Sequence, residues 1–376
     1  MSYRFRLSLL AALPLAFYAY ACSDDPTPAG DPTPDAGSQD DGGTGPGNPD
    51  SGDVIPSDGG DGGDITSCVG NPLADDDGLD GGVVIDLDGG ALRPIATGRF
   101  LDGPQWIDDD AGGAIVYSEV DNQVIVRNAP DGGARTVLRA TGLENLPIGN
   151  GRTGDFIYTA LAHTTAGGGG GSILRMQLDG GDPTAFDAGA ANSPNDLVAS
   201  SKGFVYFTDP GYQTSGISTG VFRLGPDGDV TTVTLFEGGQ AERADGIALS
   251  PDESALYVGF FDSKRIAKYT LDADGVASEP QNLPLTLTDN PTGIAVDLGG
   301  NLWIAENPAD DLAAPGRIEV FDPSGKKWGE IPFPDSRPNG IAFGGPDGKT
   351  VYVTTERGNV VEGTLYVMTS RCAGVR

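Results

Sequence analysis

The side chains in this sequence that could do chemistry carry oxygen and lie in short turns that recur along the chain. The turns contain Asp102, Asn195, Asp245, Thr292 and Asn339. Asn and Asp before Gly are also ordinary turn residues that hydrogen-bond to their own backbone. In a repeated unit that closes into a ring, however, equivalent positions turn toward one end of the central channel. We therefore expect these side chains at one channel mouth. In the second repeat Ile148 occupies the position, and Asn145 or Asn150 is expected to point inward instead.

His163 is the only histidine of the chain. Its unperturbed pKa lies near neutrality, so it could be a general base, and it could equally be a packed loop residue. There is no Gly-x-Ser-x-Gly elbow and no second histidine for a nucleophilic triad. Catalysis by this chain would therefore depend on a metal ion, with Asp209, Asp245 or His163 taking a proton from water.

The repeat itself predicts the architecture. Six anchor residues follow one another at intervals of 43 to 50 residues: Pro104, Pro147, Pro194, Ala244, Pro291 and Pro338. A period of this length is typical of solenoids and propellers. Each anchor is followed by a short aromatic or β-branched strand, and a later strand runs into an Asp-Gly or Ser-Gly turn of the hairpin type. Because no long amphipathic helical pattern intervenes, the sequence predicts an all-β, six-bladed β-propeller.

Two segments carry a resemblance to a known family. Ser193–Leu197 together with Gly203–Tyr212 resembles the hallmark segment of the SMP-30/gluconolactonase family, and Asp102–Trp106 is similar to its opening Glu-Gly-Pro-x-Trp. Segments 245–253 and 293–303 resemble its later blades. The resemblance covers about residues 95 to 370, and it implies a six-bladed propeller with a divalent cation, usually calcium, near the central channel.

The resemblance also implies a ligand set. The family's metal-ligating positions fall on Asp102, Asn195, Asp245 and Thr292. Asp245 replaces an Asn and Thr292 replaces an Asp, so the set keeps two carboxylates. Carboxylate and amide oxygens suit a hard cation such as Ca²⁺. We expect Asp102, Asn195 and Asp245 as metal ligands, and Thr292, Asn339 and Asn145 as residues that line the channel or contact the substrate.

Two functions of different classes remain open. The family resemblance implies a metal-dependent hydrolase of a lactone or related ester, in which the cation polarises the carbonyl. The alternative is a non-catalytic propeller that binds a carbohydrate or a protein partner and holds the cation as a structural element, because the fold alone does not decide function. Thr292 and Ile148 favour the second hypothesis, and the paired carboxylates favour the first.

The N-terminus has the pattern of an export signal. Arg4 and Arg6 precede an apolar run over residues 7–20, which is too short and wrongly flanked for a stable transmembrane helix. Cys22 and the polar segment after it resemble the lipobox of bacterial lipoproteins, which implies a lipid anchor at Cys22. The alternative is an ordinary secretory peptide cleaved after Ala21. We expect an exported protein, lipid-anchored in the bacterial cell envelope, at the outer membrane or in the periplasm.

The segment after Cys22 is acidic and lacks large apolar side chains. Residues 23–66 contain eleven Asp and no Lys or Arg, so they cannot bury enough apolar surface to offset the entropy of ordering. The expected organisation is a signal peptide at 1–21, a disordered tether at 22–66 and a propeller at 67–376. The net charge of −31 excludes nucleic acid as a natural partner. We expect a monomer.

Two features of the sequence address how the ring closes. With Cys22 lipidated, Cys68 and Cys372 remain, and they bracket the repeats. In an oxidising compartment such a pair is commonly bridged, although two separate thiols are the alternative. An open propeller would leave an unpaired sheet edge. We therefore expect the strand around residues 92–96 to pair with the strand at residues 363–368.

Overall fold

The structure is a computed structural model, and the described residues all belong to the second of two units, 55–376. It describes residues 72–73, 92–109, 112–164, 170–212, 219–236, 242–333, 336–357 and 362–376. The predicted signal peptide, the acidic tether, Cys22 and Cys68 lie outside these residues. All the regular secondary structure in the described ranges consists of β-strands. Accordingly, none of these ranges contains a helix long and apolar enough to cross a membrane.

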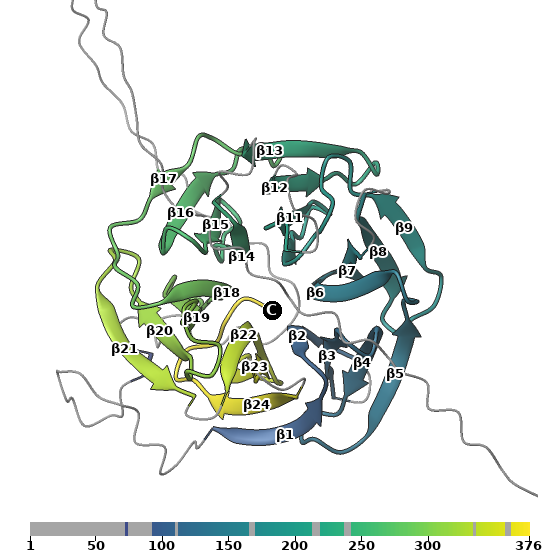
Figure 1. Cartoon of the computed structure of the whole chain (residues 1–376), viewed down its shortest axis with the longest axis horizontal. Coiled ribbons are helices and arrows are strands. Elements are labelled where there is room, and N and C mark those ends of the chain that lie inside the picture. The colour runs from purple at the N-terminus through teal and green to yellow at the C-terminus, as the bar shows by residue number, and fades with distance from the viewer. Residues whose placement is uncertain are drawn as a thin grey trace, which may run out of the picture. The chain divides into compact units, whose positions relative to one another are not determined.

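Twenty-four strands form six four-stranded antiparallel sheets around a central channel (Figure 1). The innermost strands are β2 (Leu101–Ile107), β6 (Asn145–Thr153), β10 (Leu197–Ala199), β14 (Ala244–Leu249), β18 (Asn290–Val296) and β22 (Arg337–Gly344). The second strands are β3 (Ala114–Glu119), β7 (Phe156–His163), β11 (Val205–Asp209), β15 (Ala255–Phe260), β19 (Leu302–Asn307) and β23 (Thr350–Glu356). The third strands are β4 (Val124–Asn128), β8 (Ser172–Gln177), β12 (Thr219–Leu224), β16 (Arg265–Thr270), β20 (Arg317–Phe321) and β24 (Gly363–Thr369). The outermost strands are β5 (Arg135–Ala140), β9 (Thr184–Asp187), β13 (Val230–Phe236), β17 (Gln281–Asn282), β21 (Lys327–Pro332) and β1 (Arg93–Gly98). The predicted six-bladed propeller is confirmed.

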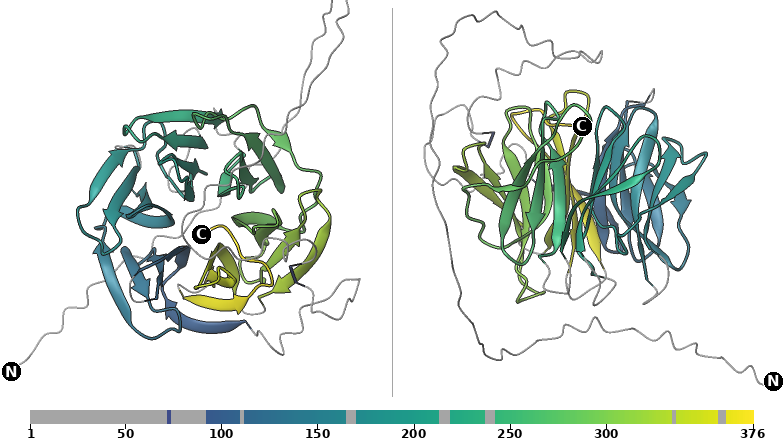
Figure 2. Two further views of the ribbon diagram at one scale, coloured as in Figure 1. Left: turned by 180° about the vertical axis from the view of Figure 1, so that it is seen from behind. Right: turned by 90° about the horizontal axis from the view of Figure 1, so that it is seen from above.

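The sixth blade combines both ends of the repeat region. Its sheet order is β22, β23, β24 and β1, so the first strand of the propeller is the outer strand of the last blade. Arg93 pairs with Val367 and Gly98 with Gly363. This pairing closes the ring and removes the free edge of β24. The predicted closure is confirmed, and Figure 2 shows the same ring from behind and from the side.

The core lies between neighbouring blades. The second strand of each blade is buried along most of its length, as in β3 and β15. Aromatic side chains fill the space between adjacent blades: Trp106 stacks on Tyr352 with ring centroids 5.8 Å apart, and Trp303 meets Phe343 edge-on at 5.4 Å. The apolar runs in the sequence therefore become strands because both of their faces are covered.

Close contact between blades requires glycine where the innermost strands begin. A Cβ on Gly293 would lie 2.1 Å from Asn339 O, and one on Gly103, whose φ is +53°, would lie 2.4 Å from Ile148 O. Gly149, Gly246 and Gly340 make equivalent approaches to the next blade. The sixth equivalent position, in blade 3, is Asp196. These five glycines and Asp196 form a ring, which we call the glycine ring. It sets the position along the channel axis at which the polar turn residues lie.

Candidate metal and substrate site

Asp245 begins the candidate site at the amino end of β14. Its side chain is 5% exposed, and the hydroxyl of Tyr212 donates a hydrogen bond to its Oδ2 over 2.6 Å. Burial raises the pKa of Asp245 to about 8; the charges of Asp102 and Glu356 add to this effect, whereas Tyr212 and Arg243 oppose it. Oδ1 accepts no hydrogen bond from the described residues, so one oxygen of Asp245 is held and the other is available.

Asp102 occupies the equivalent place in blade 1, at the start of β2. Gly103 N donates to its Oδ1 over 2.7 Å. Burial raises the pKa of Asp102 to about 7, Glu356 raises it further, and the hydrogen bond from Gly103 opposes both. Because Asp102 also raises the pKa of Asp245, the two carboxylates interact electrostatically. Each would gain from a positive charge between them.

Asp196 and Glu356 complete a group that we call the carboxylate cluster: Asp102, Asp196, Asp245 and Glu356. Asp196 accepts hydrogen bonds from Leu197 N at 2.9 Å and Ile247 N at 3.2 Å. Burial, and then the charges of Asp102 and Asp245, raise its pKa well above the usual range. Burial also raises the pKa of Glu356, although its ion pair with Arg337 at 3.1 Å opposes this. Full ionisation of the cluster is therefore unfavourable unless a cation is bound.

Asn195 adds an amide next to the cluster. Its backbone is fixed on both sides, since its N donates to Thr208 O and its O accepts from Gly149 N, both over 2.8 Å. The side chain is 8% exposed, and within the described residues its amide makes no hydrogen bond. Its amide oxygen is therefore available to a cation.

The donor set fits a hard divalent cation, because it consists of two carboxylates of raised pKa and an amide oxygen. In the described ranges, no group of three or more His, Cys, Asp or Glu side chains is arranged to hold a metal ion. Asp102, Asn195 and Asp245 contain only two such side chains. Further coordination would come from backbone oxygens, water or substrate, as calcium sites allow.

Thr292 takes a different position from its neighbours in the ring. Its hydroxyl lies 3.0 Å from Pro338 O and 3.3 Å from Ala305 O. A hydroxyl has one proton to donate, and here that proton joins blade 5 to blade 6. Asn339 is likewise engaged between blades, with Nδ2 3.4 Å from Leu101 O and Oδ1 accepting from Asn307 Nδ2 at 3.3 Å. Both residues are near the channel and serve the contact between blades.

Of the other predicted site residues, Asp209 and His163 end second strands, whereas Asn145 begins the innermost strand β6. Asp209 is fully buried, and its oxygens accept hydrogen bonds from Asn192 N, Ser193 N and Gly211 N, which hold the surrounding loops together. His163 ends β7 and pairs in register with Asn145 at the start of β6. The amide of Asn145 lies 3.4 Å from Thr141 O in its own turn. No described contact joins these three side chains to the carboxylate cluster.

Tyr212, Asp196 and Glu356 were not among the residues predicted from the sequence. Tyr212 follows Asp209 by three residues within the family segment, and its orientation depends on the stacking of Arg243 5.3 Å from its ring centre. Asp196 could have been recognised as the one position of the glycine ring that is not glycine. Glu356 gives no local signal, because only ring closure brings blade 6 beside Asp102.

Comparison with known proteins gives a family match over most of the propeller. Residues 101–357 match the family described as the SMP-30/gluconolactonase/LRE-like region. The chain is 30% identical over 296 residues to a gluconolactonase of Zymomonas mobilis, covering 70% of this chain and 78% of that one. It is 33% identical over 153 residues to lactonase drp35 of Staphylococcus aureus, covering 39% of this chain and 44% of that one.

Solved structures share the fold. A gluconolactonase from Xanthomonas campestris superposes with a TM-score of 0.59 at 23% identity, covering 75% of this chain and 90% of that one. A calcium-binding protein, regucalcin, from Agrobacterium tumefaciens superposes with a TM-score of 0.59 at 17% identity, covering 76% and 96%. With the family match over most of the propeller, these comparisons show that the chain belongs to the SMP-30/gluconolactonase/LRE-like family.

Proposed function

We propose that this protein hydrolyses a lactone or a related ester with a divalent cation, calcium, held by Asp102, Asn195 and Asp245. The observation that carries the proposal is that Asp102 and Asp245, at the start of innermost strands from different blades, lie close enough for the charge of Asp102 to raise the pKa of Asp245. Relatives named gluconolactonase and lactonase support the reaction class. A relative of the same fold named as calcium-binding supports the choice of cation.

A bound cation would polarise the carbonyl of the lactone and stabilise the developing oxyanion. The chain's own residues supply the rest. Tyr212 holds Oδ2 of Asp245, so that Oδ1 keeps a fixed direction. Because Oδ1 of Asp245 accepts no hydrogen bond from the described residues, Asp245 can take a proton from water beside the cation. Asp209 is less suited, because three backbone N–H groups occupy its oxygens.

Hydrolysis of a panel of γ- and δ-lactones tests the proposal. The Asp245→Ala variant should lose at least about 100-fold in kcat/KM, as expected when a group that binds the metal and moves the proton is removed. Asp227→Ala, in an exposed turn where Asp227 accepts only from Asp229 N, is the matched control and should keep full activity. Equal activity of the two variants would overturn the proposed site.

A second function rests on Thr292. Its hydroxyl, which donates to Pro338 O, is a weaker ligand than the carboxylate that the family has at this position. A weaker ligand set favours a structural cation in a propeller that binds a carbohydrate or a protein partner. If no lactone of the panel is hydrolysed while calcium still raises the melting temperature, this second function replaces the first.

We also propose that the protein acts at the cell envelope, attached through a lipid on Cys22. The proposal rests on the lipobox-like sequence before Cys22 and the acidic segment after it. In a bacterial host, Cys22→Ser should move the protein from the membrane fraction to the soluble fraction. Mass spectrometry of the mature N-terminal peptide provides the check, because a lipid-free peptide that begins at Cys22 or Ser23 would contradict the anchor.

A further inference from the structure

The central channel contains a cavity of about 730 Å³, which adjoins the carboxylate cluster at Asp196. It is bordered by the carboxyl ends of the innermost strands, including Ala199, Leu249, Val296 and Phe343, and by the turns that follow them. Asp102, Asn195 and Asp245 lie at the amino ends of the same strands. None of these three residues lines the cavity. The cavity therefore adjoins the proposed metal site without including its ligands, and its volume is that of an ordinary small-molecule pocket.

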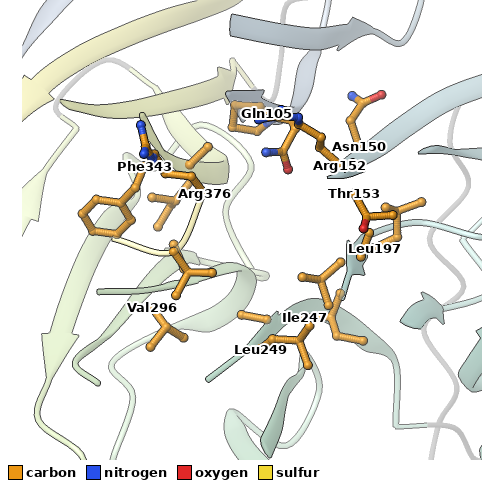
Figure 3. Close-up of a pocket in the computed structure, with 18 of the residues that line it drawn as sticks. Gln105, Asn150, Arg152, Thr153, Leu197, Ile247, Leu249, Val296, Phe343 and Arg376 are labelled. Carbon is orange, nitrogen blue, oxygen red and sulfur yellow. The ribbon is translucent and has the colours of Figure 1, made fainter. Parts of the chain in front are cut away.

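The wall of the cavity has two chemically different sides (Figure 3). Blades 1 and 2 supply the polar side chains Gln105, Arg152 and Thr153, and Arg376 joins them. The amide of Asn150 is already bound to Gly103 O and Ser118 Oγ. Blades 3 to 6 supply an apolar surface with Leu197, Ile247, Leu249, Ile294, Val296 and Phe343. A ligand that fits must match both sides.

Two arginines that border the cavity, Arg152 and Arg376, share the carboxylate of Asp108. Arg152 Nη1 donates to Asp108 Oδ2 over 2.9 Å, and Arg376 Nη1 lies 3.5 Å from Asp108 Oδ1. Asp108 is half exposed, whereas the side chains of Arg152 and Arg376 are 22% and 31% exposed. Since each guanidinium has five N–H donors, and the described residues use only some of them, donors remain for an anion.

The segment that carries Arg376 is fixed in place. Val375 N donates to Val296 O over 3.0 Å, Gly374 N donates to Gly348 O over 3.0 Å, and Leu298 N donates to Ala373 O over 2.8 Å. Gly374 packs so closely on Phe343 that a Cβ there would lie 1.9 Å from its Cγ. Arg376 is thus preorganised beside Arg152, which lowers the entropic cost of binding a ligand.

We propose that this cavity binds an organic monocarboxylate with an apolar body, with its carboxylate on Arg152 and Arg376 and its body against Ile247, Leu249 and Val296. Arginine is suited to carboxylates because its donors bind both oxygens. A polyanion fits less well, since Asp108, Asp196 and Glu253 also border the cavity. Glu253 is already occupied, accepting from Ser201 N and Oγ. The site does not depend on the proposed hydrolysis.

Calorimetric titration of the full-length protein with decanoate tests this site. Chelator is present throughout, so that the proposed metal site takes no part. Decanoate should bind, and both Arg152→Gln and Arg376→Gln should weaken binding at least about tenfold, the loss expected for one charge-assisted pair. Decanol, which has no charge, and acetate, which has no apolar body, should both bind at least about tenfold more weakly than decanoate.

Arg99→Gln is the matched control, because it removes one positive charge from an exposed side chain whose carboxylate partner, Asp121, is 3.9 Å away. It should leave decanoate binding unchanged. Melting temperatures show whether a variant has lost only the contact or also the fold. If Arg152→Gln melts at a lower temperature than the wild type, decanoate binding by Arg376→Gln and by the charge-conserving Arg152→Lys decides whether the arginines hold the carboxylate. Decanoate binding that is absent, matched by decanol or acetate, or unchanged in both arginine variants overturns the proposal.

Discussion

The hydroxyl of Tyr212 donates a hydrogen bond to Oδ2 of Asp245 over 2.6 Å. Tyr212 follows β11 in blade 3, whereas Asp245 lies in β14 of blade 4. Arg243 covers the Tyr212 ring, and Phe261 meets it edge-on at 6.2 Å. The contact therefore fixes a candidate ligand by a residue from the neighbouring blade.

Tyr212→Phe should weaken calcium binding while leaving the fold intact. The variant removes only the hydroxyl and keeps the ring contacts with Arg243 and Phe261. A hydrogen bond to a charged group contributes about 1.5–3 kcal/mol, so the calcium dissociation constant should rise by about 10-fold to 100-fold. Calorimetric titration measures the change, and an unaltered constant would show that Tyr212 does not position Asp245.

The ring and the candidate ligands differ in how far the sequence predicts them. The regular spacing of the anchors predicts six blades and one shared channel mouth, because position along a repeat determines position in the ring. The spacing does not predict which residue of the neighbouring blade a side chain contacts. Thr292 turns to Pro338 O, and Asp196 fills a place that glycine occupies in the other blades. Such choices depend on the backbone of the next blade, which no local pattern describes.

Glu306 on β19 and Glu319 on β20, both in blade 5, provide a pH-dependent test of the fold. Both are fully buried, and Oε1 of Glu306 and Oε2 of Glu319 have no donor among the described residues. A proton shared between them satisfies both. Burial, and then the contact with Glu319, raise the pKa of Glu306 to about 9 from 4.5, against Asp289 N and Arg317. Hydrogen bonds from Glu306, Lys327 and Thr288 hold the pKa of Glu319 low despite its burial.

Folded protein therefore keeps a proton on Glu306 that unfolded protein releases above pH 4.5. This contribution to stability is fully present below that pH and is lost as the pH rises toward 9. Glu306→Gln keeps a donor for Glu319 without the titration, so its melting temperature should fall less than that of the wild type between about pH 5 and pH 9. Parallel curves for the two proteins would exclude the shared proton.

The predicted Cys68–Cys372 disulfide remains a prediction, since Cys68 lies outside the described residues. Two observations nearby support it. Arg371 N lies 3.4 Å from Pro72 O, and Leu73 packs against the apolar core of blades 5 and 6. On the chain-entropy model a bridge that closes so long a loop would stabilise the fold by about 5 kcal/mol, and by less where β1 already pairs with β24. Peptide mapping without reduction should recover the two cysteines in one linked peptide; two separately alkylated peptides would refute the bridge.

The rate of lactone hydrolysis by chelated protein during titration with calcium tests the central claim most directly. The rate should rise from background to a plateau, and Asp245→Ala should abolish the rise. Thr292→Val, which removes a hydroxyl used between blades, should leave the calcium dependence within about threefold of the wild type. A chain that begins at Thr66 lacks the eleven aspartates of the acidic segment and should give the same curve. Full activity in chelator, or no hydrolysis at any calcium concentration, would contradict a calcium-dependent lactonase.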